Sequence, residues 1–124
     1  MKQLILLLLI ATITACTNAQ TLTPDPFHHA LTTDTTIQLL DVRTPDEYNQ
    51  AHIPHATLIN INDPHFETQI HTLHITRPVY LYCHSGRRSR TAATILKKHG
   101  FHTVVELKGG IEAWQQAGKP TTTP

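Results

Sequence analysis

A cysteine followed by a glycine and two arginines is the part of this sequence best suited to chemistry. Cys83 follows the apolar and aromatic run 78–82, which is typical of a buried strand, and precedes a helical pattern. Backbone N–H groups in such a loop, the start of the next helix and the cations of Arg87 and Arg88 all favour an anion. Gly86 allows the loop to curl so that its amides face the sulfur. Together they favour the thiolate of Cys83, which is the nucleophilic form.

Alternating strand and helix patterns surround this loop. Helices are expected to begin at Asp25-Pro26, at Asp63-Pro64, after the loop, and after a turn at Gly109-Gly110. Thr44-Pro45-Asp46-Glu47 is a capping box, which predicts another helix beginning at Pro45. Short apolar or alternating runs predict strands at 37–42, 57–61, 78–82 and 101–107. This order predicts an α/β fold with a mainly parallel central sheet flanked by helices, and such sheets place ligand sites at the carboxyl ends of their strands.

Four stretches resemble the motifs of the rhodanese-like domain family. The loop Cys83-His84-Ser85-Gly86-Arg87-Arg88-Ser89 is similar to that family's active-site loop, Cys-x-x-Gly-x-Arg followed by Ser or Thr. Residues 41–48, 51–56 and 107–120 are similar to three further motifs, in the same order along the chain. The resemblance covers 27–120 and implies a single rhodanese-like domain. Ala51 and His55 replace family glycines, and His55 would be strained if its φ is positive.

The resemblance implies a sulfurtransferase with Cys83 as its catalytic residue. Cys83 would take sulfur from a donor such as thiosulfate and hold it as a persulfide, and a thiol or cyanide would then accept it. The resemblance implies no metal and no organic cofactor. The ten histidines are scattered, and we expect surface or structural roles for all but His84. The residues expected to bind substrate are His84, Ser85, Gly86, Arg87, Arg88 and Ser89.

Two other functions are compatible with a loop of this type. A cysteine phosphatase has an arginine six positions after the cysteine, but here that position is Ser89, and Arg88 lies five positions on. A persulfide carrier or a binding module would lack turnover, although a carrier needs the same loop. Nearby, Arg43 and Glu47 are expected to form a structural pair, Asp41 to hold neighbouring backbone, and Trp114 to pack in the core.

The first residues have the pattern of an export signal. A lysine and the short apolar run 4–10 predict a signal peptide over 1–15, because a membrane span needs about 20 apolar residues. The stretch 13–16 (Ile-Thr-Ala-Cys) resembles the bacterial lipobox, which implies lipid attachment at Cys16 and a periplasmic protein anchored to the outer membrane. An ordinary signal peptide is the alternative. With Cys16 acylated, Cys83 would be a lone thiol in an oxidising compartment.

Charge and composition limit the remaining possibilities. The chain has 124 residues, which suits one small domain. Its 10 basic and 9 acidic side chains nearly cancel, which argues against a nucleic-acid partner. Residues 16–26 lack apolar periodicity and are expected to form a tether, and the tail 121–124 is expected to fray.

Overall fold

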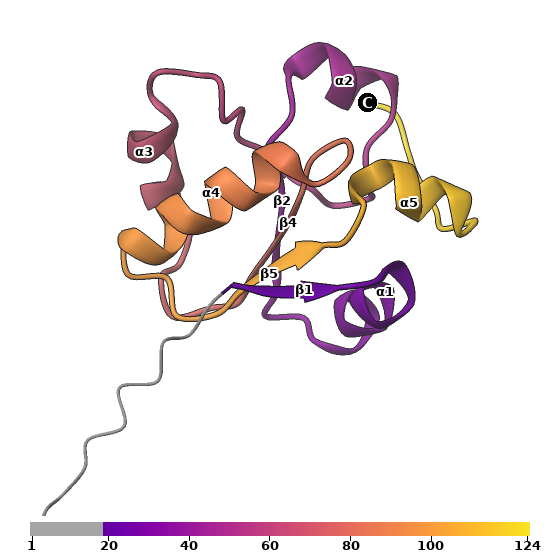
Figure 1. Ribbon diagram of the computed structural model, residues 1–124, viewed down its shortest axis with the longest axis horizontal. Coiled ribbons are helices and arrows are strands. Elements are labelled where there is room, and N and C mark those ends of the chain that lie inside the picture. Colours follow the sequence, from indigo (N-terminus) through magenta and orange to yellow (C-terminus); the bar gives the residue numbers. More distant parts are fainter. Residues whose placement is uncertain (1–18) are drawn as a thin grey trace, which may run out of the picture.

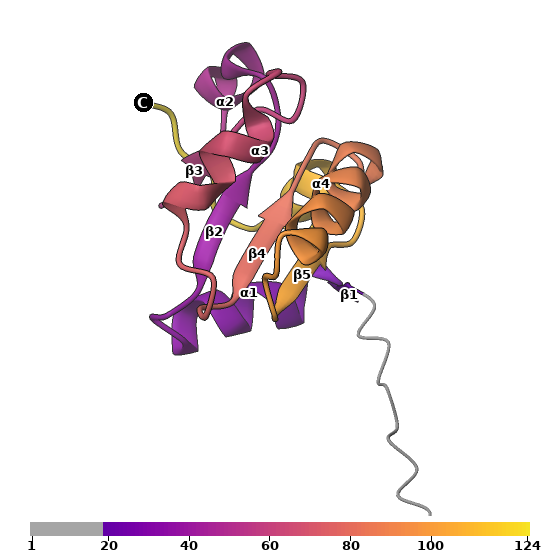
Figure 2. The same ribbon diagram turned by 90° about the vertical axis from the view of Figure 1, so that its left-hand side faces the viewer.

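Five parallel strands form the centre of the protein, in the order β1-β5-β4-β2-β3 (Figures 1 and 2). The structure is a computed structural model, and it describes residues 19–124. The strands are β1 (Gln20–Leu22), β2 (Gln38–Asp41), β3 (Thr57–Leu58), β4 (Val79–Tyr82) and β5 (Val104–Leu107). The helices are α1 (Pro24–Thr33), α2 (Pro45–Gln50), α3 (Phe66–Gln69), α4 (Arg87–Lys98) and α5 (Gly110–Gln116), and a 3₁₀ turn, Ile70–Thr72, follows α3. The predicted α/β fold is confirmed.

Side chains alternate between the two faces of the sheet. On β4, Val79 and Leu81 face one core, whereas Tyr80 and Tyr82 face the other. Figure 1 shows α3 and α4 on one face of the sheet and α1 and α5 on the opposite face. Both faces are therefore buried, as is usual for a parallel sheet. Trp114 of α5 is 1% exposed, so the prediction that it packs in the core is confirmed.

The segment expected to be a tether is in part a strand. Residues 20–22 form β1, which pairs with β5 at the edge of the sheet, and α1 begins at Pro24 with Thr23 as its N-cap residue. The prediction of a tether over 16–26 is therefore wrong from residue 20 onward. A strand of three residues is too short to show periodicity, and its hydrogen bonds to β5 come from the backbone. The predicted signal peptide over 1–15 and Cys16 lie outside the described residues.

The capping box acts as the sequence predicts. The Thr44 hydroxyl accepts a hydrogen bond from the backbone N–H of Glu47, and the Glu47 carboxylate accepts one from the backbone N–H of Thr44. Pro45 occupies the first turn of α2.

Other elements are shorter than predicted. The strand expected over 57–61 covers only β3, and the helix expected from Asp63-Pro64 is one turn of α3 followed by the 3₁₀ turn.

Two connecting segments differ from ordinary loops. His55 has a φ of 70°, so the strain expected at this family glycine position is present. Thr122 exchanges two backbone hydrogen bonds with His52, at 2.8 and 2.9 Å. The tail predicted to fray is therefore fixed at this residue, because it adds an antiparallel bridge.

Within residues 19–124, no helix combines the length and the apolar character that crossing a membrane requires.

Candidate active site

Cys83 lies directly after β4, at the carboxyl edge of the sheet. Its side chain is buried, with 1% of the residue exposed. Gly86 has a φ of 115° and caps the start of α4, a conformation that favours glycine. This curl brings the backbone N–H of Gly86 to 3.0 Å from the Cys83 Sγ atom, which accepts its hydrogen bond. The prediction that the loop turns its amides toward the sulfur is confirmed at Gly86.

Hydrogen bonding favours the thiolate of Cys83. Burial opposes the loss of the thiol proton, since a charged sulfur is poorly solvated inside the protein. Hydrogen bonding to the Ser89 side chain and to the backbone N–H groups of Ser89, Gly86 and Ser85 outweighs burial and lowers the pKa of Cys83 below its ordinary value. A cysteine with a lowered pKa is the more reactive nucleophile near neutral pH.

The first turn of α5 fixes the other side of the loop. The backbone N–H groups of Ile111 and Glu112 donate to the carbonyl oxygens of Cys83 and His84, at 2.9 and 3.1 Å. This close approach requires glycine at residue 110, because a Cβ atom there would overlap the same two carbonyl groups. The loop is therefore held between the start of α4 and the start of α5.

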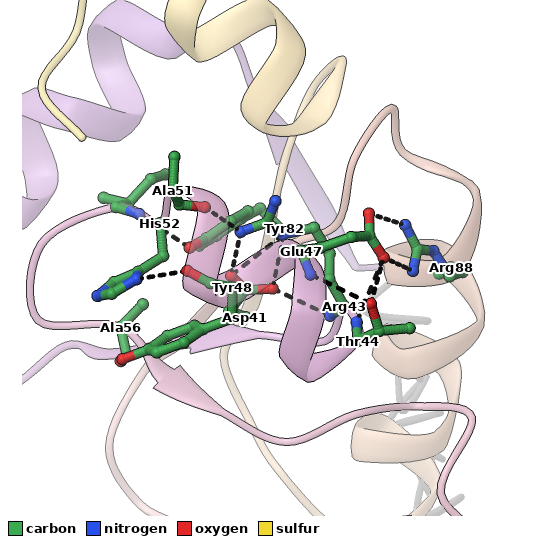
Figure 3. Close-up of polar contacts among 11 residues, drawn as sticks. Asp41, Arg43, Thr44, Glu47, Tyr48, Ala51, His52, Ala56, Tyr82 and Arg88 are labelled. Atoms are coloured by element: carbon green, nitrogen blue, oxygen red, sulfur yellow. Dashed lines mark hydrogen bonds and ion pairs between the residues drawn. The ribbon is translucent and has the colours of Figure 1, made fainter. Parts of the chain in front are cut away.

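Arg88 is held by a carboxylate rather than left free beside the sulfur. Its two terminal nitrogens donate to the Glu47 carboxylate oxygens at 2.6 and 2.9 Å (Figure 3). This bidentate pair, with the capping bonds of Thr44, depresses the pKa of Glu47 to about 2 although burial opposes the charge. The pair fastens α4 to α2. The Glu47 carboxylate also offsets much of the positive charge of Arg88, which the sequence analysis expected to stabilise the Cys83 thiolate.

The expected pair between Arg43 and Glu47 is wrong, because each side chain has another partner. Arg43 is 4% exposed and donates to Asp41, with 2.7 Å between Nη2 and Oδ2, and to the carbonyl oxygen of Ala51 (Figure 3). Asp41 also accepts a hydrogen bond from the backbone N–H of Arg43 at 3.0 Å. The prediction that Asp41 holds neighbouring backbone is therefore confirmed. Charge alone does not decide whether Arg43 pairs with Asp41 or with Glu47, because both are carboxylates. In the structure its partner is Asp41, which is fully buried.

Two cavities flank the loop. The first has a volume of about 290 Å³ and is lined by Arg43, Glu47, Gln50, Ala51, His84, Ile111 and Gln115. The second, on the side of β1 and β5, has a volume of about 330 Å³ and is lined by Thr21, Ser85, Gly86, Arg90, Glu106, Leu107, Lys108 and Gly109. The loop therefore has polar space on both sides into which small anions could enter.

The predicted substrate-binding residues separate into different positions. His84 lines the first cavity and is exposed, and Ser85 and Gly86 line the second. Ser89 is buried, and Arg88 is half-buried against Glu47. Arg87 is exposed and lines neither cavity, so the structure does not bring it to the sulfur with the others.

Sequence analysis missed Glu106 as part of this site. It is 8% exposed on β5, and its Oε1 accepts a hydrogen bond from the Ser89 hydroxyl at 3.0 Å. The alternation of β5 gave a signal, since it places Glu106 on the same face as Val104. A carboxylate on the buried face of a central strand needs a partner, and the partner here comes from α4.

No group of three or more His, Cys, Asp or Glu side chains in the described part of the chain could hold a metal ion. His71 and His99 meet edge to face, with ring centroids 5.2 Å apart, and His99 contacts Glu67 on the surface.

Comparison with known proteins agrees with this geometry. A family model described as the rhodanese-like domain matches residues 23–117. The chain is 36% identical over 90 residues to YrkF of Bacillus subtilis, which is named as a sulfur carrier, and this match spans 73% of the chain but only 48% of that protein. It is 33% identical over 81 residues to the thiosulfate sulfurtransferase GlpE of Shewanella oneidensis, covering 65% of the chain and 78% of that protein.

A solved structure has the same fold. The solution structure of the rhodanese-like domain from the Alr3790 protein of Anabaena matches with a TM-score of 0.77 and 28% sequence identity. The match covers 86% of this chain and 81% of that one. The sheet and the helices that position the Cys83 loop are therefore shared with that domain.

Proposed function

The chain belongs to the rhodanese-like domain family, and we propose that it is a sulfurtransferase which moves sulfur from thiosulfate, through a Cys83 persulfide, to a thiol or cyanide. Relatives named as sulfurtransferases or sulfur carriers support sulfur transfer in general. The observation that carries the proposal is the buried Cys83 sulfur, which accepts the Gly86 N–H and has a lowered pKa.

The proposed reaction has two balanced steps. The Cys83 thiolate attacks the outer sulfur of thiosulfate, a sulfur–sulfur bond forms to Cys83, and the bond to the sulfonate sulfur breaks with release of sulfite. The persulfide then gives its outer sulfur to cyanide or to a thiolate, and the Cys83 thiolate returns. Each step transfers one sulfur atom and keeps the total charge constant. The N–H groups that stabilise the thiolate also favour the anionic persulfide.

The alternatives are a carrier without turnover and a cysteine phosphatase. The chain matches only 48% of YrkF, the relative named for sulfur carriage, so that protein has a further part outside the match. This favours considering a carrier that works with a further domain. A phosphatase is less compatible with the loop, because Ser89 occupies the position of the phosphatase arginine and is buried against Glu106.

Turnover separates these functions. The protein is incubated with thiosulfate and cyanide, and thiocyanate is measured over time, with Cys83→Ser as the matched control. We expect many equivalents of thiocyanate per protein molecule and none from the variant. A single equivalent would indicate a carrier, and hydrolysis of an aryl phosphate without thiocyanate would indicate a phosphatase.

We also propose that Cys16 carries a lipid anchor which holds the domain at the periplasmic face of the outer membrane. Support comes from the stretch 13–16 after the apolar run 4–10. Acyl chains contribute about 0.8 kcal/mol per buried methylene, so a multiply acylated cysteine would resist extraction by salt. Membranes from expressing bacteria are washed with high salt and the protein located by immunoblot. Recovery of the unmodified protein in the soluble periplasm would reject the anchor, whereas Cys16→Ala should abolish the acyl mass.

A further inference from the structure

The two charged side chains that line the first cavity already have partners. Arg43 donates to the buried Asp41 at 2.7 Å, and Glu47 accepts from Arg88 at 2.6 Å. Each charge is therefore balanced by an opposite charge of the protein itself. A charged ligand that enters the first cavity meets little net charge there.

The second cavity, in contrast, holds cations without such partners. It is lined by Arg90 of α4 and by Lys108, which follows β5, and both residues are exposed. The ion pairs within residues 19–124 include neither of them. Glu106 also lines this cavity, but it is only 8% exposed and accepts a hydrogen bond from the Ser89 hydroxyl. Two cations that face solvent and one buried carboxylate make the cavity attractive to anions.

The second cavity also reaches the backbone that holds the sulfur. Gly86 lines it, and the N–H of Gly86 lies 3.0 Å from the Cys83 Sγ atom. A Cβ atom at residue 86 would have the Gly109 nitrogen as its nearest neighbour, at 3.9 Å, so no side chain fills this side of the loop. Ser85 and Thr21 line the cavity as well, and their hydroxyl groups can donate to an anion. A ligand in the second cavity therefore lies against the Cys83 loop.

We infer that the second cavity binds the sulfur acceptor, an organic thiol that carries carboxylate groups, and that Arg90 and Lys108 select it over neutral thiols. The inference rests on the proposed function and names the class of acceptor. The cavity volume of about 330 Å³ lies within the range of about 300–1,000 Å³ that is usual for small organic ligands. It is larger than cyanide or thiosulfate requires.

The positions of the two cations favour the acceptor over the donor as their ligand. In thiosulfate the charged sulfonate is bonded directly to the sulfur that Cys83 attacks, so its charge lies at the loop itself. In an organic thiol the carboxylates are several bonds away from the reacting sulfur. Arg90 and Lys108 stand outside the loop 83–89, where such distant carboxylates would lie.

The transfer step is balanced. The acceptor thiolate attacks the outer sulfur of the Cys83 persulfide, and a sulfur–sulfur bond forms to the acceptor. The bond to the Cys83 sulfur breaks, and its electron pair stays on Cys83 as the thiolate. The acceptor leaves as its own persulfide, and the total charge is unchanged.

Single-turnover transfer tests this selection directly. The full chain carrying Cys16→Ala is treated with polysulfide to form the Cys83 persulfide, and the excess is removed. The loss of the extra sulfur is then followed by intact mass after mixing with mercaptosuccinate, which carries two carboxylates, or with mercaptoethanol, which carries none. The readout is the ratio of the two second-order rate constants, because the intrinsic reactivity of each thiol cancels when variants are compared.

Removing the cations should lower this ratio. Arg90→Gln and Lys108→Gln should each reduce it by about 3-fold, and the double variant by about 10-fold, as expected for solvent-exposed charge pairs. Raising the salt from about 0.05 M to about 0.5 M should reduce the ratio in the native protein and not in the double variant. Lys98→Gln, at an exposed lysine in the last turn of α4, is the matched control and should leave the ratio unchanged.

Circular dichroism verifies that each variant is folded. An unchanged ratio in the folded double variant, an equal fall in Lys98→Gln, or a persulfide that neither thiol can discharge would overturn the inference. Slower loading by thiosulfate with an unchanged acceptor ratio would also overturn it, because the cavity would then serve the donor. Since polysulfide forms the persulfide, a protein that does not react with thiosulfate would reject the proposed function and still test the acceptor site.

Discussion

Replacing Glu47 by glutamine removes the charge that pairs with Arg88 and keeps the size of the side chain. Glu47 and Arg88 are 41 residues apart in sequence, and their pair joins α2 to the first turn of α4. The change therefore tests whether this contact holds the start of the helix that bears Ser89. It should destabilise the fold in a way that depends on pH.

The magnitude follows from the depressed pKa of Glu47. Its pKa falls from 4.5 to about 2, chiefly through hydrogen bonds from Arg88, a shift equivalent to roughly 3 kcal/mol at most. The two side chains are 29% and 28% exposed, so water screens the pair. Because of this screening we expect about 1–2 kcal/mol. A carboxylate with a lowered folded pKa stabilises the protein above its unfolded pKa, and this stabilisation is lost as the pH falls through the folded value.

Urea denaturation followed by the fluorescence of Trp114, the single tryptophan, gives the free energy of unfolding at each pH. Glu47→Gln should be less stable than the native protein by about 1–2 kcal/mol at pH 7, and this difference should shrink between about pH 4.5 and pH 2. Asp46→Asn, in the same helical turn but exposed, is the matched control and should have a smaller effect. A difference that stays constant over this pH range, or that equals the control, would refute the reasoning.

Three other changes test the loop and its surroundings by the same denaturation assay. Gly110→Ala should lower the free energy of unfolding by about 3 kcal/mol and slow the reaction of Cys83, because the added Cβ overlaps the loop carbonyls. The control is Gly118→Ala, which should lower it by only about 1 kcal/mol because its Cβ would have no neighbour within 4 Å. His55→Gly should stabilise the protein by about 0.5–1 kcal/mol because it relieves a φ of 70°, and no gain would mean that other contacts compensate the strain. Deletion of residues 121–124 should cost about 1–2 kcal/mol through two lost hydrogen bonds to His52, and an unchanged stability would show that this bridge contributes nothing.

The sequence predicts the fold and the nucleophile well because both depend on local patterns. The apolar and aromatic run of β4 and the capping box of α2 are each recognised within a few residues, and the structure confirms both. The position of Cys83 after a central strand follows from the order of the elements. The turn at Gly86 likewise needs only one residue with a positive φ.

The partners of the charged groups could not be predicted in the same way. Glu47 and Arg88, or Ser89 and Glu106, meet only after distant segments pack, and opposite charge alone does not choose between Arg43 and Arg88 as the partner of Glu47. β1 was missed for a related reason, because its three residues acquire strand structure by pairing with β5.

The central claim is that Cys83 accepts a sulfur atom from thiosulfate. Its most direct test is the intact mass of the full chain carrying Cys16→Ala after incubation with thiosulfate and removal of excess donor. The account predicts a gain of one sulfur, about 32 Da, that is reversed by cyanide and absent when Cys83→Ser is added. An unchanged mass in protein whose folding has been verified would contradict the account.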